Sequence, residues 1–158
     1  MQKISPFVWF DNNAEEAMNF YLSIFKDSKI IRSARNPPGA PGPEGLLLVA
    51  SIQLDGQELM LMNGGPGHPL TDAISFLINC STQDEVDHYW SRLLEGGGKE
   101  IACGWLKDRF GLHWQVTPSI LPQLLGDPDR AKAGRVMQAM MKMIKLDIAA
   151  IKAAAESK

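Results

Sequence analysis

The chain has 158 residues, a length that fits one domain or two small modules. Hydrophobic residues make up 45% and charged residues 22%, which excludes a disordered or fibrous chain. Sixteen Lys and Arg against 18 Asp and Glu give a net charge of −2, without the positive excess that binds nucleic acid. No run approaches the ~18 apolar residues of a membrane span. With two cysteines and no signal-peptide pattern, we expect a cytoplasmic protein with neither nucleic acid nor membrane as a partner.

The first part of the chain alternates strand and helix signals. Residues 4–10 are aromatic and β-branched and predict a strand. Asn13 and Glu16 then form a variant of the capping box that starts a helix over 13–25. Further strands are predicted at 29–35, 46–54 and 57–63. The dipeptide Asp55-Gly56 predicts a hairpin turn between the last two strands.

The same signals recur further along the chain. Residues 73–80 predict a strand, and Thr82 with Glu85 is a capping box that starts a helix to Leu94. The glycines at 96–98 end this helix. Further strands are predicted at 99–105, near Leu106, and at 113–118.

Two spacings relate the halves of the chain. The triplets Tyr21-Leu22-Ser23 and Tyr89-Trp90-Ser91 lie 68 positions apart, whereas Gly56 and Gly111 in the last hairpins lie 55 positions apart. The difference is close to the length of a loop rich in Pro and Gly at 36–45, so one insertion reconciles the two spacings. The sequence therefore predicts a duplicated β-α-β-β-β unit, with modules at 1–66 and 67–118.

The remaining segment, 119–158, is predicted to be a helical extension. Asp127-Pro128 is a typical N-cap and first-turn pair and predicts one helix to about Ala155. Five apolar residues form one stripe on that helix: Met137, Met141, Ile144, Ile148 and Ile151. The stripe is expected to pack on the domain or on a second subunit. We predict a homodimer, because the edges of the sheets also need to be covered.

A doubled β-α-β-β-β unit of this size resembles the vicinal oxygen chelate superfamily, which includes glyoxalase I, extradiol dioxygenases and bleomycin-resistance proteins. Five segments resemble its PhnB-like branch, often labelled the 3-demethylubiquinone-9 3-methyltransferase family: PFVWFDNNAEEAMNFY, MNGGPGHP, AISFLINCSTQDEVDHYW, CGWLKDRFGLHWQVTP and DPDRAKAGRVMQAMMKMIKLDI. The resemblance implies an α+β fold, the glyoxalase/bleomycin resistance fold. In it, two tandem βαβββ modules form a cup-shaped mixed sheet, here followed by a C-terminal helical extension.

The superfamily resemblance also implies a divalent metal in the cup, held by the first and last strand of each module. By register, the four ligand positions are Pro6, Met60, Ile74 and Gln115. Divalent ions prefer imidazole and carboxylate ligands, and only Gln115 could ligate one, so no metal or other cofactor is expected. The methyltransferase label is not supported either. No glycine follows the first strand, where a nucleotide-binding fold of the Rossmann type needs a glycine-rich turn.

Strand alternation predicts which side chains line the cup. Met60 and Gln115 are expected to face it from the last strand of each module. Phe10 and Phe76 are expected to face it from the outer strands, with Trp105 near the rim. An apolar concavity with few polar groups suits a small organic ligand. Alternatively, these side chains fill the cup themselves and the protein is an interaction domain.

Three residues are candidates for catalysis. Glu58 and His113 are related by the repeat and could act as acid and base, and Cys103 could act as a nucleophile if a base activated it. The plainer interpretation is two solvated residues beside turns and a buried free cysteine. The charged run 107–109 is interpreted as a solvated turn. We therefore expect a metal-independent small-molecule binding protein, with lyase, isomerase or dioxygenase chemistry as the alternative.

Overall fold

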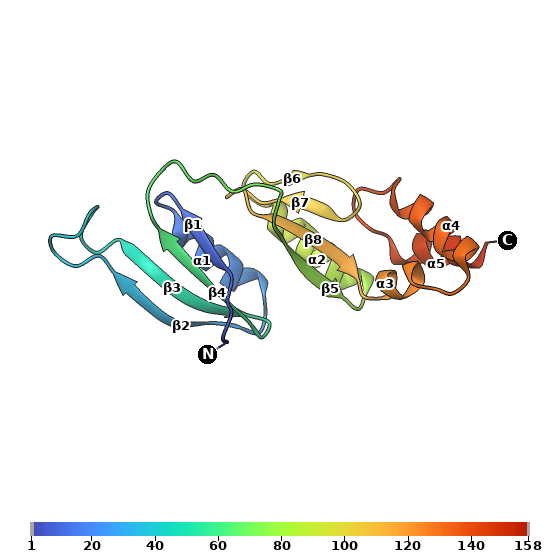
Figure 1. Ribbon diagram of the computed structural model, residues 1–158, viewed down its shortest axis with the longest axis horizontal. Coiled ribbons are helices and arrows are strands. Elements are labelled where there is room, and N and C mark those ends of the chain that lie inside the picture. Colours follow the sequence, from blue (N-terminus) through green and yellow to red (C-terminus); the bar gives the residue numbers. More distant parts are fainter. Residues whose placement is uncertain (1, 158) are drawn as a thin grey trace. The chain divides into compact units, whose positions relative to one another are not determined.

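The computed structural model describes residues 2–157, and the chain folds into two compact units that divide between Leu70 and Thr71. Each unit contains a four-stranded mixed sheet with the element order β-α-β-β-β, and three more helices follow in the second unit (Figure 1). The predicted α+β fold, with two tandem βαβββ modules and C-terminal helices, is confirmed. Within residues 2–157, no helix combines the length and the apolar character that crossing a bilayer requires.

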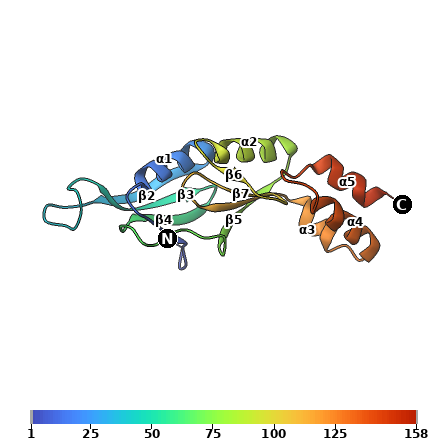
Figure 2. The same ribbon diagram turned by 90° about the horizontal axis from the view of Figure 1, so that it is seen from above.

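The first unit consists of β1 (Phe7–Phe10), α1 (Ala14–Ile24), β2 (Ser28–Arg35), β3 (Leu47–Leu54) and β4 (Gln57–Asn63). Its strand order is β1-β4-β3-β2, with β1 parallel to β4 and the other pairs antiparallel. α1 covers one face of this sheet (Figure 2). Val8, Leu61 and Ala50 lie in one row across the sheet and are all buried. Tyr21 and Ile24 of α1 are buried too, so this face and the helix form the core.

The start of α1 is capped differently from the prediction. The helix does begin after Asn13, but the Asn13 side chain makes no capping hydrogen bond. Instead, Asn63 at the end of β4 accepts a hydrogen bond from the Ala14 backbone N–H through Oδ1, at 2.8 Å. Asn63 also donates through Nδ2 to the Leu47 carbonyl at 2.9 Å. A side chain distant in sequence therefore connects the helix to two strands.

The second unit begins with β5 (Ser75–Cys80), α2 (Gln83–Leu94), β6 (Lys99–Glu100), β7 (Trp105–Lys107) and β8 (His113–Pro118), in the order β5-β8-β7-β6. Thr82 caps α2 as predicted: its Oγ1 accepts a hydrogen bond from the Glu85 N–H at 3.2 Å. The predicted strand over 99–105 is wrong. The chain turns at Cys103 and Gly104, which have φ of 53° and 83° in the left-handed region, so that region holds two short strands.

Asp108 contradicts the predicted solvated turn at 107–109, because only 2% of it is exposed. Its Oδ1 accepts hydrogen bonds from the backbone N–H groups of Phe110 and Leu112, at 2.9 and 3.0 Å. Its Oδ2 accepts a hydrogen bond from Trp114 Nε1 at 2.9 Å. The carboxylate therefore fixes both the turn between β7 and β8 and the indole that follows it.

The C-terminal segment forms three helices, α3 (Ile120–Leu125), α4 (Arg130–Met140) and α5 (Ile148–Glu156), so the predicted single helix is wrong. α4 begins three residues after Asp127, and Asp129 caps it by accepting from the N–H groups of Ala131 and Lys132. Asp147 caps α5 in the same way through the N–H of Ala150.

The chain between α4 and α5 is held by the rest of the second unit. Leu146 is fully buried in a cluster with Leu121, Val136, Ile151 and Ala155. The Gln83 side chain donates to the Leu146 carbonyl and accepts from the Ile148 N–H, at 3.2 and 2.9 Å. These contacts stop the helix, and the predicted apolar stripe is divided: Ile151 is buried, whereas Met141 is 66% exposed.

Candidate functional site

The face of the first sheet opposite α1 is called the first open face here. Its central row contains Phe7, Met60, Ser51 and Arg32, which are neighbours on β1, β4, β3 and β2. The next row contains Trp9, Met62, Val49 and Ala34. Phe7 is 51% exposed although it is a large apolar residue. This face is therefore mostly apolar at its centre, as in many small-molecule sites.

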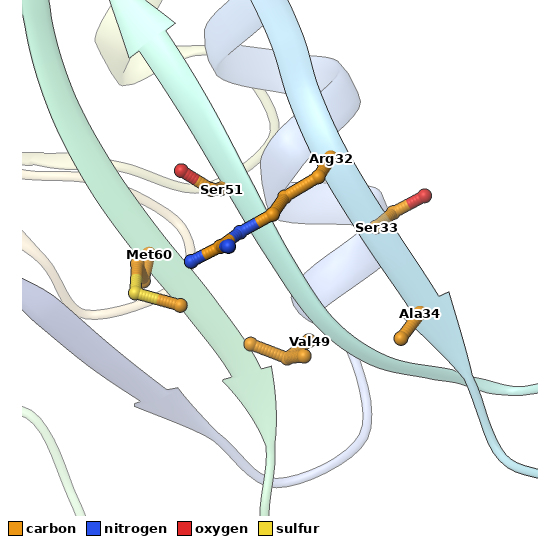
Figure 3. A pocket seen from close by; sticks show the side chains of 6 residues that line it. All are labelled: Arg32, Ser33, Ala34, Val49, Ser51 and Met60. Carbon is orange, nitrogen blue, oxygen red and sulfur yellow. The ribbon is translucent and has the colours of Figure 1, made fainter. Parts of the chain in front are cut away.

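A hollow of about 230 Å³ lies on the first open face. It is lined by Arg32, Ser33, Ala34, Val49, Ser51 and Met60 (Figure 3). Met60 is a predicted ligand-binding residue, and the structure places it on this face, in the wall of the hollow. The other lining residues come from β2 and β3, which sequence reasoning did not connect with a site.

Trp9 anchors the segment that follows β4. Its Nε1 donates to the Gly65 carbonyl at 2.8 Å, and its ring lies 4.4 Å from the His68 ring, centroid to centroid. Gly64 lies against the indole so closely that a Cβ atom there would be 2.2 Å from Cζ2. The motif MNGGPGHP thus has a structural role: its glycines let the chain pass over an aromatic ring.

The predicted positions of Phe10 and Phe76 facing the cup are wrong. Phe10 is 4% exposed and lies on the same face as Val8, which α1 covers. Phe76 is the register partner of Trp114, and their rings make an edge contact with centroids 5.5 Å apart. Because the first strands pair in parallel with Phe7 opposite Met60 and Leu77 opposite Gln115, the residues on the uncovered faces are Phe7 and Leu77.

The face of the second sheet that carries Gln115 is called the second open face here. Gln115 has Leu77 and Trp105 as its register neighbours, and Leu77 is 48% exposed. Gln115 donates through Nε2 to the Ser75 hydroxyl at 2.9 Å. The structure therefore brings together two predicted ligand-binding residues, Trp105 and Gln115, on one face.

The three candidate catalytic residues lie in different places. Glu58 lies on the first open face, and its Oε2 accepts from the Gln2 backbone N–H at 3.4 Å. His113 lies on the second open face and is 7% exposed, and its Nδ1 has no hydrogen-bond partner within residues 2–157. It is therefore not the solvated residue that its place beside a turn suggested. The pairing of Glu58 with His113 stays a prediction.

The two cysteines differ in their surroundings. Cys80 is buried at the end of β5, and burial, with a smaller contribution from the Glu85 charge, raises the pKa of its thiol to about 12. Cys80 is therefore protonated and inert at neutral pH. Cys103 is half-buried, and its backbone N–H donates to the Met143 carbonyl at 2.9 Å. A role for Cys103 as a nucleophile stays a prediction.

The side chains at the implied metal positions do not fit a divalent ion. In the observed register, the open-face residue opposite Met60 is Phe7 and the one opposite Gln115 is Leu77. Phe and Leu have no donor atom, the Met thioether suits soft metals, and the single amide oxygen of Gln115 does not make a ligand set for a divalent ion. Within residues 2–157, no three His, Cys, Asp or Glu side chains form a group that could hold a metal.

The first unit also does not fit the nucleoside cofactor of a methyltransferase of the Rossmann type. Such a fold presents a glycine-rich turn between its first strand and helix. Here β1 leads into α1 through Asp11, Asn12 and Asn13, and the Ala14 N–H at the helix start is already bonded to Asn63. Neither sheet is the all-parallel sheet of that fold.

Comparison with known proteins gives a family. The model of the family described as 3-demethylubiquinone-9 3-methyltransferase matches residues 2–117. The solved PhnB protein of Bacillus cereus, which carries the same family name, is 36% identical; the match covers 74% of this chain and 99% of that one, with a TM-score of 0.68. A search of the curated proteins gave no match.

More distant solved structures share the fold alone. A protein from Pseudomonas aeruginosa is 22% identical over 72% of this chain and 95% of its own, with a TM-score of 0.56. The fosfomycin resistance protein FosX of Mesorhizobium loti is 10% identical over 80% of this chain and 100% of its own, with a TM-score of 0.58. The chain therefore belongs to the family described as 3-demethylubiquinone-9 3-methyltransferase.

Proposed function

We propose that this protein binds a small organic ligand in the cytoplasm, without a metal, on the open faces of its sheets. The observation that carries the proposal is the central row of the first open face. There, Phe7 and Met60 leave apolar surface uncovered beside a hollow of about 230 Å³. Exposed apolar surface of this kind is unfavourable in water, and in monomeric proteins it commonly marks a binding site.

The proposed contact residues are Met60 on the first sheet, and Trp105 and Gln115 on the second. The second face has a similar exposed apolar residue, because Leu77 on the edge strand β5 is 48% exposed beside Gln115 on β8. On each face the apolar surface is accompanied by few polar groups, such as the Ser75–Gln115 pair. Such a surface selects a ligand by its shape and a small number of hydrogen bonds.

The neutral dye N-phenyl-1-naphthylamine, which fluoresces in apolar surroundings, tests the proposal. We expect its fluorescence to rise with added protein, and Met60→Gln to weaken binding by about five-fold, because it replaces part of the apolar contact by a polar amide. The matched control is Leu48→Gln on β3, because Leu48 is 38% exposed and does not line the hollow. The proposal fails if the dye does not respond, or if both variants weaken it equally.

We also propose that the protein is a homodimer. Met137, Met141 and Ile144 are between 41% and 66% exposed along the helical extension, which is more apolar surface than a lone subunit tends to leave in water. Native mass spectrometry is expected to give twice the 17.4 kDa of one chain, and Met141→Glu to shift the population towards the single chain. A single-chain mass at micromolar concentration contradicts this.

A further inference from the structure

Arg32 is a cation on the otherwise apolar centre of the first open face. It lies on β2 directly opposite Ser51 of β3, which is opposite Met60 of β4. Its side chain extends across β3 towards Met60, with Ser51 and Val49 on either side (Figure 3). The guanidinium is therefore part of the hollow and does not simply point away from the sheet.

Among the described residues the Arg32 guanidinium has no partner, unlike Arg35 on the same strand. Arg35 forms an ion pair with Glu15 and donates to the Gly45 carbonyl at 3.0 Å. Within residues 2–157, Arg32 has neither a carboxylate partner nor a hydrogen bond. A guanidinium has five N–H donors in a planar fork that matches an oxyanion. The donors of Arg32 are thus available to a ligand.

Ser51 adds a second polar group to the same place. The residue is 6% exposed and lies in the row between Arg32 and Met60, and within residues 2–157 its hydroxyl has no hydrogen-bond partner. A hydroxyl can donate to an anionic oxygen. A cation and a hydroxyl therefore come from opposite positions on β2 and β3 and both line the hollow.

We propose that Arg32 and Ser51 bind the anionic group of the ligand, a carboxylate or a phosphonate, while its apolar body lies on Met60 and Phe7. This inference rests on the proposed function and specifies its ligand as a small organic oxyanion. Bidentate bonds from arginine give such a group both affinity and orientation. The row Arg32, Ser51, Met60 and Phe7 orders the contacts from polar to apolar across one sheet.

The test compares benzoate and phenylphosphonate with benzamide, which has the same ring and no charge. With amide NMR spectra of the whole chain, we expect both anions to shift the Arg32, Ser51 and Met60 signals, with a Kd of about 1 mM, as is usual for so small a ligand. Benzamide should bind at least five-fold more weakly than either anion.

Arg32→Gln should weaken the binding of benzoate about ten-fold or more and leave the binding of benzamide unchanged, because only the charge-assisted hydrogen bonds are lost.

Lys29→Gln is the matched control, because Lys29 lies on the same strand, opposite Gln53 on the same face, outside the hollow. It should change benzoate binding by less than about two-fold, because Lys29 does not line the hollow in which the anion is expected to bind. Equal binding of benzoate and benzamide, no binding by either, or equal effects of the two variants would overturn the inference. The response to N-phenyl-1-naphthylamine is independent of charge, so it reports separately whether the proposed function itself holds.

Discussion

Replacing Asp108 with Ala is expected to lower the free energy of unfolding by about 3–5 kcal/mol, because it removes the common acceptor of three donors that are buried or partly buried. Two of them are the backbone N–H groups of Phe110 and Leu112, and the third is Trp114 Nε1. When the carboxylate is removed, water has little access to these donors to accept their hydrogen bonds in its place, since Asp108 is 2% exposed and Trp114 is 3% exposed. In a chain of this size, such a loss lowers Tm by about 8–15 °C.

Asp108→Asn separates the backbone bonds from the indole bond. The amide oxygen can still accept from the turn, but its NH₂ group then faces the Trp114 N–H, so we expect a loss of about 2 kcal/mol. Asp55→Asn is the matched control, because Asp55 is exposed in a turn at φ 45°, a conformation that Asn tolerates, and the change should be within about 0.5 kcal/mol. Urea unfolding followed by tryptophan fluorescence measures both. Equal stability of the two Asn variants would show that the hydrogen bond from Trp114 to Asp108 does not stabilise the fold.

Much of the architecture can be read from local signals. The strands β4 and β8 coincide with their predicted ranges, because each follows a turn with a glycine at positive φ, and β8 also alternates polar and apolar residues. Thr82 marks the start of α2 by the chemistry of its own side chain. Where the residues that determine an element lie within it, the sequence is sufficient.

Local signals do not predict which side chains of β1 and β5 face the helices. Phe7 to Phe10 are four consecutive apolar or aromatic residues, so alternation gives no signal for which of them face α1. Their orientation is set by the parallel register with β4, in which Phe7 and not Phe10 shares a face with Met60. A register change of one residue moves every side chain to the other face, which is why the sequence pattern alone assigns Phe10 and Phe76 to the wrong one.

The helix break before α5 and the burial of Asp108 have a different cause. The apolar period continues through residues 137–151, but Leu146 is held by Gln83, and Met143 and Ile144 accept hydrogen bonds from the turn at Cys103 and Gly104. Asp108 lies in a charged run, and nothing local distinguishes it from a solvated residue. In both places, contacts between segments distant in sequence override the local pattern.

Gly64→Ala and Gly134→Ala are expected to have opposite effects. A Cβ atom at Gly64 would lie 2.2 Å from Cζ2 of Trp9, so the indole must move and lose its hydrogen bond to Gly65, at a cost of about 2–4 kcal/mol. Gly134 lies inside α4, and a Cβ atom there would meet nothing within 4 Å outside its own helix, so Ala should stabilise the chain by about 0.5–1 kcal/mol.

Thermal unfolding and the near-ultraviolet circular dichroism of the tryptophans measure this pair. Gly64→Ala should change the tryptophan signal even at low temperature, because Trp9 is displaced in the folded protein, whereas Gly134→Ala should raise Tm with the same signal. Since Trp9 lies beside Met62 on the first open face, its displacement should also weaken binding of N-phenyl-1-naphthylamine. If Gly64→Ala is as stable as the parent, the Trp9 indole can move away from the chain at Gly64 without a cost in stability. The MNGGPGHP segment then does not fix this edge of the proposed site.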